Sequence, residues 1–154
     1  MDERKPTGTE ADQRIEAAEG LLSEHATMVI ASCTKGAPWI ARVFFVDDEP
    51  SQGKLDLCCA LVAGQERLKS VESGPVAFFI GGDEPGRWAT GSGVVEHVGD
   101  DDDQAAIIKR LRDTSWQAEE FLAVASPVPV RIHVERLTVT DLDASPPVAE
   151  FTFA

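Results

Sequence analysis

The chain has 154 residues, of which 43% are hydrophobic and 27% are charged, a composition typical of a single soluble globular domain. Its formal net charge of −13 argues against a nucleic-acid partner, because neutralising phosphates requires a basic face. No apolar run approaches the ~20 residues of a membrane span, and the first residues lack the apolar core of a secretory signal. We therefore expect a cytoplasmic protein without a membrane partner.

The cysteines support the same location. Cys33, Cys58 and Cys59 are odd in number, and adjacent cysteines form a strained disulfide, so reduced thiols are the simpler interpretation. No His and Cys cluster has zinc-ligand spacing, and we expect no metal site.

The N-terminal segment predicts a polar flexible tail followed by a helix. Residues 1–8 are polar, and the T-x-x-E spacing from Thr7 to Glu10 is that of a capping box. Ile15, Ala18 and Leu22 then form a narrow apolar stripe. We expect a helix that ends near residue 24 and lies against the outside of a sheet.

Three strands joined by tight turns follow this helix. They are expected at residues 27–34, 39–46 and 54–60, with turns at 35–38 and 47–53.

The second of these strands carries an arginine between two apolar faces. Side chains alternate along a strand, so Ile40, Arg42 and Phe44 share one face, while Trp39, Val43 and others share the opposite one. The pattern predicts burial on both sides, and a buried guanidinium needs an anion. That anion is either a structural carboxylate or a ligand phosphate or carboxylate held by the guanidinium fork.

The middle of the chain alternates a short helix with two further strands. We expect the helix at residues 64–73, ending at Gly74-Pro75, and strands at 76–80 and 88–98. Gly91 and Gly93 share one face of the later strand. They indicate either a barrel corner that needs small residues or a close approach by ligand or backbone.

The C-terminal third begins with an acidic run at residues 100–103, which favours a solvated first helical turn over calcium binding. A second helical piece is expected at 114–125. The strand after it alternates from Val128, then falls out of phase at Leu137, which predicts a bulge near Glu135-Arg136. Residues 144–154 are expected to be a flexible tail whose two phenylalanines pack on their own domain or on a second subunit.

This order of elements predicts a single domain over residues 1–154. The fold class is mainly β with peripheral helices (α+β), and hairpin-linked strands of this number favour a small antiparallel barrel.

With the elements in order, residues 25–142 resemble the pyridoxamine 5'-phosphate oxidase-like FMN-binding split-barrel family. The resemblance rests on five segments in order. They are a first strand (25–32), a Gly-x-Pro turn (36–38), an arginine-bearing second strand (41–46), a basic residue opening a short helix before an x-Pro-x-apolar strand (67–78), and a Gly-x-small-x-Val segment (91–95).

The resemblance implies a homodimeric, six-stranded antiparallel split β-barrel with FMN in each of two interface grooves. By position, Arg42 and Arg67 would meet the cofactor phosphate, with Lys69 as a helper. The backbone at Val43 and Phe44 would flank the flavin ring. Trp88 would either stack on the ring or substrate, or anchor the dimer.

The function implied is a flavin-dependent oxidoreductase that moves a hydride between the flavin and a small-molecule substrate. Because the cofactor carries such chemistry, no catalytic side chain is assigned, and all three histidines are expected to be structural or solvated. The alternatives are a non-catalytic flavin, deazaflavin or haem binding protein, and a dimer that has lost its ligand. Glu66, beside the proposed phosphate position, is the best argument for the last alternative.

Overall fold

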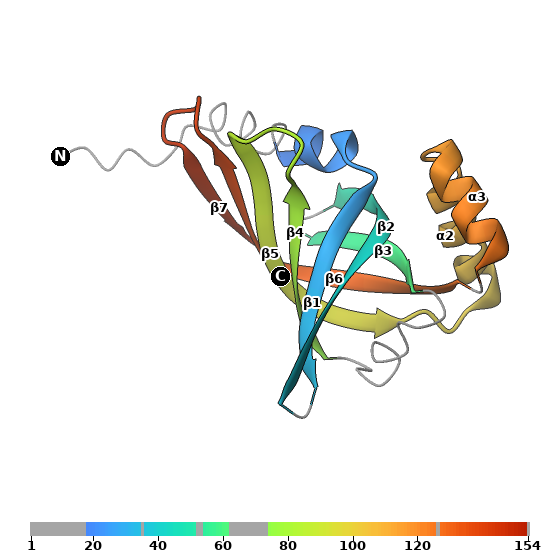
Figure 1. Ribbon diagram of the computed structural model, residues 1–154. Helices are drawn as coiled ribbons and strands as arrows, with labels where there is room; N and C mark the ends of the chain where they lie inside the picture. Colours follow the sequence, from blue (N-terminus) through green and yellow to red (C-terminus); the bar gives the residue numbers. More distant parts are fainter. Residues whose placement is uncertain (1–17, 35, 52–53, 62–73, 126, 154) are drawn as a thin grey trace.

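The computed structural model describes residues 18–34, 36–51, 54–61, 74–125 and 127–153. It consists of antiparallel strands, a helical segment at residues 18–24, and two further helices (Figure 1). In chain order the strands and helices are β1 (Thr27–Thr34), β2 (Ala37–Ser51), β3 (Lys54–Leu61), β4 (Pro75–Gly81), β5 (Arg87–His97), α2 (Asp101–Arg112), α3 (Trp116–Val124), β6 (Val128–Asp141) and β7 (Val148–Thr152). The expected helix at residues 64–73 lies outside the described residues.

The strands close into a six-stranded antiparallel barrel with one additional strand. The sheet order is β3-β2-β1-β4-β5-β6-β7, and β3 also pairs with the first half of β6, which closes the ring. The second half of β6 pairs with β7. The predicted fold class is confirmed, and residues 148–152, expected in a flexible tail, instead form β7.

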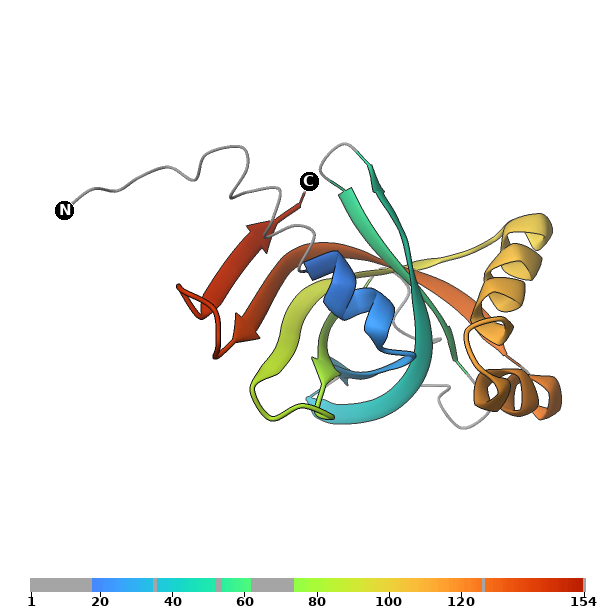
Figure 2. The same cartoon turned by 90° about the horizontal axis from the view of Figure 1, so that it is seen from above.

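Two clusters of apolar side chains hold this architecture together. The larger one fills the barrel, and the helical segment 18–24, seen from above in Figure 2, adds Leu21 and Leu22 to it. The smaller one lies between the outside of β2 and β3 and the helices α2 and α3, and Cys58 and Leu111 are fully buried in it. The first helical segment therefore contributes to the barrel core, and α2 and α3 cover part of the outer face.

Local sequence signals explain the ends of both later helices. The Asp100 side chain accepts a hydrogen bond from the Asp102 amide at the start of α2, and the following acidic turn faces the positive end of the helix dipole. Ser115 accepts one from the Ala118 amide at the start of α3, at 3.1 Å. The acidic run is thus the first turn of a helix, as its position predicts.

A β-bulge in β6 produces the phase change seen in the sequence. Ser92 pairs with Arg136, whereas the next residue, Gly93, pairs with Val134, so Glu135 is the extra residue. Opposite the bulge, Cβ atoms added to the two β5 glycines would clash with β6: at Gly93 the carbonyl oxygen of His133 would be 2.2 Å away. The close approach of the β6 backbone therefore accounts for both glycines.

Candidate functional site

The outer face of β2 carries the arginine that the sequence singles out. Val43 and Phe45 are buried in the barrel, which leaves Ile40 and Arg42 on the opposite face, and both are exposed, Ile40 to 72%. The prediction that this strand is buried on both sides is therefore wrong for its first half. Arg42 needs no anion to offset burial, and its guanidinium is accessible to one.

Apolar and small side chains surround Arg42 on this face. Val29 of β1 lies beside it in register, and Phe79 of β4, which is 38% exposed, lies beside Val29. The next row places Ile40 beside Ala31. Within the described part of the chain, Arg42 has no hydrogen bond or ion pair. Among the described residues it is therefore a cation without a partner, on an apolar surface of an acidic protein.

At Arg42, the backbone of β2 has hydrogen-bonding groups that no described strand pairs with. The Phe45 amide donates to the Ala26 carbonyl at 3.0 Å, so the main-chain groups of Phe45 point toward β1. Because these groups alternate along an antiparallel strand, those of Arg42 and Phe44 point to the other side of β2. There the pairing of β2 with β3 begins at Phe45 and Cys59, and no described strand pairs with Arg42 on this edge.

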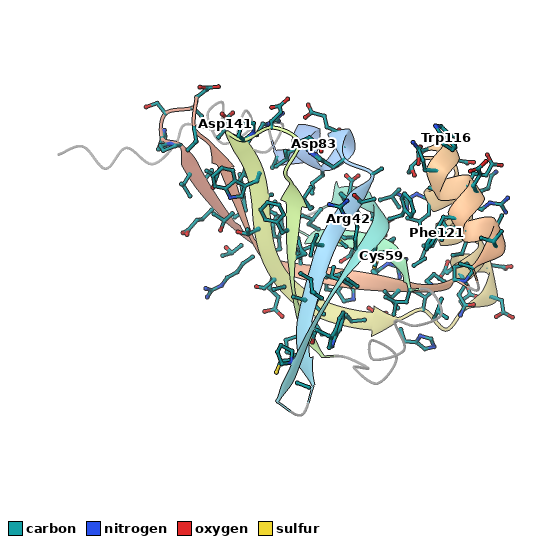
Figure 3. The ribbon with its side chains drawn as sticks, in the orientation of Figure 1. Arg42, Cys59, Asp83, Trp116, Phe121 and Asp141 are labelled. Atoms are coloured by element: carbon teal, nitrogen blue, oxygen red, sulfur yellow. The ribbon has the colours of Figure 1, made fainter. Side chains whose placement is uncertain are left out.

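An aromatic pair forms one side of this region. The Phe44 ring contacts the Phe121 ring of α3, with centroids 5.8 Å apart and planes inclined at 49°. Phe121 remains 45% exposed, and Figure 3 shows it on the side of α3 that faces the barrel. The outer face of β2 thus offers a guanidinium and an apolar wall, beside a backbone edge that no described strand pairs with at Arg42.

A carboxylate clamp positions α2, and with it α3, against the barrel. Asp48 of β2 accepts hydrogen bonds from the Arg110 guanidinium of α2, from Arg131 Nε at 3.4 Å and from Cys58 Sγ at 3.4 Å. Arg110 also donates to the Asp47 carbonyl at 2.6 Å. Burial alone would raise the pKa of Asp48, but the hydrogen bonds from Arg110 and Cys58 and the two arginine charges hold it below its ordinary value.

The two adjacent cysteines are buried thiols. Cys58 lies under α2 and Cys59 lies in the barrel core, and neither side chain has accessible surface. Burial, reinforced by the Asp48 carboxylate, raises the pKa of Cys58 to about 11, and burial raises that of Cys59 to about 12. Both therefore remain thiols at neutral pH, and thiols are poor nucleophiles.

No histidine lies beside Arg42. His133 of β6 is held between carboxylates: Nδ1 lies 2.6 Å from Asp56 Oδ1, and Nε2 contacts Glu96. His25 bonds through Nδ1 to the Leu21 carbonyl at 2.8 Å. The third histidine is exposed at the end of β5. These placements agree with structural or solvated roles.

The other predicted site residues are separated or undescribed. The Val43 side chain points into the barrel core, so only its backbone can face a ligand. Trp88 lies half-buried on β5, where it pairs with Gly81, three strands from Arg42 or roughly 14 Å across the sheet. Arg67 and Lys69 lie outside the described residues. Sequence reasoning missed Phe121 and the clamp at Asp48, because their partners lie far away in the sequence and no local motif marks them.

The described helices include none that is long and apolar enough to cross a membrane. Among the described side chains, no group of three or more His, Cys, Asp or Glu residues is arranged to hold a metal ion.

Comparisons with known proteins connect this arrangement to solved structures. No protein-family model matches the sequence, and a search of curated proteins finds no match. Sixty-four chains among solved structures match the fold.

One is a protein of the pyridoxinephosphate oxidase family from Clostridium acetobutylicum, related to general stress protein 26, with a TM-score of 0.61 and 13% identity over 92% of this chain and 95% of that one. Another is an FAD binding protein from Mycobacterium smegmatis, with a TM-score of 0.55 and 16% identity over 90% of this chain and 95% of that one. A haem binding protein from the same organism gives a TM-score of 0.60 and 18% identity over 97% of this chain, which spans 59% of that protein. The likeness establishes the fold: the chain has the split-barrel fold of these proteins.

Proposed function

We propose that this protein binds a flavin on the outer face of β2, with the flavin phosphate on Arg42, and acts as an oxidoreductase on a small-molecule substrate. The observation that carries the proposal is an exposed guanidinium without a partner among the described residues, placed on an apolar face beside a backbone edge that no described strand pairs with. This combination suits a ligand that is anionic at one end and flat and apolar at the other. FMN has this chemistry.

The residues around Arg42 would contact different parts of the flavin. The guanidinium holds the phosphate through paired N–H groups, and the main-chain groups of Arg42 offer hydrogen bonds to polar atoms of the ring. Phe44 and Phe121 supply an apolar wall that excludes water. When bound, a flavin supplies hydride transfer through its ring, while the protein supplies orientation and electrostatics.

A second copy of the chain would complete the groove. Ile40 and Phe79 are exposed apolar side chains on the same continuous face as Arg42, and exposed apolar patches of this kind mark interaction surfaces. Pairing two such faces would enclose the flavin between subunits. Light scattering should give a dimer, and Ile40→Asp should convert it to a monomer that binds FMN more weakly. A monomeric wild-type protein would contradict this arrangement.

Haem is the second candidate, because one structural neighbour is a haem binding protein. Haem in proteins commonly has a histidine as axial ligand. All three histidines are described, two of them are engaged in hydrogen bonds, and none is beside Arg42. The structure therefore favours flavin over haem at this face.

Visible absorption spectroscopy tests the proposal. Purified protein is titrated with FMN, deazaflavin coenzyme and haem in turn, and we expect tight uptake of one flavin per subunit. Arg42→Ala should weaken FMN binding by about tenfold to a hundredfold, the range for a charge-assisted hydrogen bond, and Arg42→Lys by less. Arg136→Ala, which removes an exposed arginine from the outer face of β6, is the matched control. Equal FMN affinity of Arg42→Ala and wild type would exclude Arg42 as the phosphate ligand.

A further inference from the structure

A cavity lies away from the Arg42 face. It has a volume of about 480 Å³ and lies between the helical segment 18–24, the start of β3, and the β6 and β7 strands. Small-molecule sites commonly occupy roughly 300–1,000 Å³. None of the residues placed around Arg42 lines this cavity, so it is independent of the proposed flavin site.

The wall of the cavity is mostly apolar. Leu22, Leu55 and Leu137 line it from the barrel core, and Phe151 lines it from β7. Phe151 is only partly buried although it packs against that core. A ligand with an apolar body would therefore cover an aromatic surface that the protein itself leaves partly open.

Three charged residues line the same cavity. Glu19 is half-buried, while Lys54 and Glu150 are exposed. None of the three has an ion-pair or hydrogen-bond partner within the described part of the chain. A half-buried carboxylate gains more from a counter-ion than an exposed one does, because water screens it less.

The charges favour one kind of ligand. Two carboxylates oppose one ammonium group at the rim, in a chain whose formal net charge is −13. A cationic group on a ligand would meet Glu19 or Glu150, whereas an anionic group would meet two like charges and a single, fully solvated lysine.

We propose that this cavity binds a small molecule with an aromatic or aliphatic body and one protonated amine, the amine paired with Glu19. The apolar wall takes the body, and the carboxylates select the charge of the head group. The assignment holds whether or not the protein binds a flavin, because it uses none of the flavin-site residues.

Three probes that share an indole body and differ in head-group charge test the proposal. Tryptamine is cationic, tryptophol neutral and indolepropionate anionic. Each is titrated into the full-length, ¹⁵N-labelled protein, and amide shifts report both location and affinity. We expect shifts around Leu22, Leu55 and Phe151 with tryptamine, and affinity at least about fivefold higher for tryptamine than for the other two.

Substitutions of the charged lining residues distinguish charge recognition from nonspecific hydrophobic binding. Glu19→Gln should weaken tryptamine binding by about two- to fivefold, and Lys54→Gln should strengthen it. Glu120→Gln, at an exposed position on α3, changes the net charge by the same amount as Glu19→Gln and should have no effect on tryptamine binding. All three substitutions are at polar positions and should leave the fold intact.

Three outcomes would overturn the proposal. The first is the absence of shifts at the cavity with any probe. The second is binding of tryptophol or indolepropionate as tight as that of tryptamine. The third is an unchanged tryptamine affinity in Glu19→Gln. Cavity binding by a protein that takes up no flavin would support this inference while contradicting the proposed function.

Discussion

Replacing Asp48 by asparagine removes one negative charge that two arginines and a thiol share, and it keeps the shape of the side chain. The Asp48 side chain is 31% exposed, and those of Arg110 and Arg131 are 43% and 24% exposed. Exposed ion pairs contribute up to about 1 kcal/mol, and hydrogen bonds to charged groups about 1.5–3 kcal/mol when protected from water. At this intermediate exposure we expect Asp48→Asn to lower the free energy of unfolding by about 1–2 kcal/mol in total. For a chain of this length, that corresponds to a fall in Tm of about 2–8 °C.

The loss should depend on pH with a definite sign. The pKa of Asp48 is lower in the folded protein than its ordinary value of 3.8. Its contribution to the free energy of unfolding is therefore complete above pH 3.8 and disappears as the pH falls through the folded-state pKa, because the protonated carboxyl resembles asparagine. Wild type and Asp48→Asn should differ fully at neutral pH and converge in strong acid.

Urea denaturation followed by tryptophan fluorescence measures this difference at each pH. Asp143→Asn is the control, because Asp143 is exposed and its side chain has no partner among the described residues. A double-mutant cycle with Arg110→Gln should show that the two substitutions are not additive. If Asp48→Asn unfolds at the same urea concentration as wild type at neutral pH, the clamp does not stabilise the fold and the reasoning is refuted.

Three further outcomes follow from single side chains. Burial alone would lower the pKa of His133, but its carboxylate partners raise it above 6.5, so its contribution to stability is present below that pH and is lost at alkaline pH. His133→Gln should therefore lower the urea midpoint more in mild acid than in alkali. Equal losses at both pH values would contradict the ion pairs. Gly91→Ala would place a Cβ atom 2.3 Å from Phe78 Cζ, so we expect thermal unfolding to show a free energy of unfolding lower by about 1–3 kcal/mol. Gly99→Ala is the control and should be neutral, because its Cβ atom would have no atom within 4 Å. A thiol reagent should modify the exposed Cys33 in the native protein and leave the two buried cysteines unmodified. Mass spectrometry would show this pattern, and rapid labelling of all three cysteines would contradict the burial of two of them.

The strands and the bulge could be predicted because their signals are local. Alternation of apolar residues fixes the side of β6 that faces the core, and the phase change after Val134 has no explanation in a regular strand other than an extra residue. Turn residues likewise mark the ends of β1, which begins and ends where the sequence predicts.

The surroundings of Arg42 could not be predicted in this way. A strand with two apolar faces has the same pattern whether its second face is covered by protein or left open to a partner. Ile40 is apolar and exposed, so composition alone does not distinguish the two cases. The contact between Asp48 and Arg110 joins residues 62 positions apart, and no periodicity relates them.

The pairing of β3 with β6 has a consequence for how the chain folds. It joins Asp56 to His133, which are 77 positions apart, and it is the pairing that turns an open sheet into a ring. Bringing such distant segments together costs loop entropy before any contact forms, and folds dominated by pairings of this kind fold in milliseconds to seconds. Until that step, the side chains that later fill the barrel interior are open to water on an unclosed sheet. We therefore expect ring closure to be the slow step, and the interval before it to be when the chain is most exposed to association with other chains.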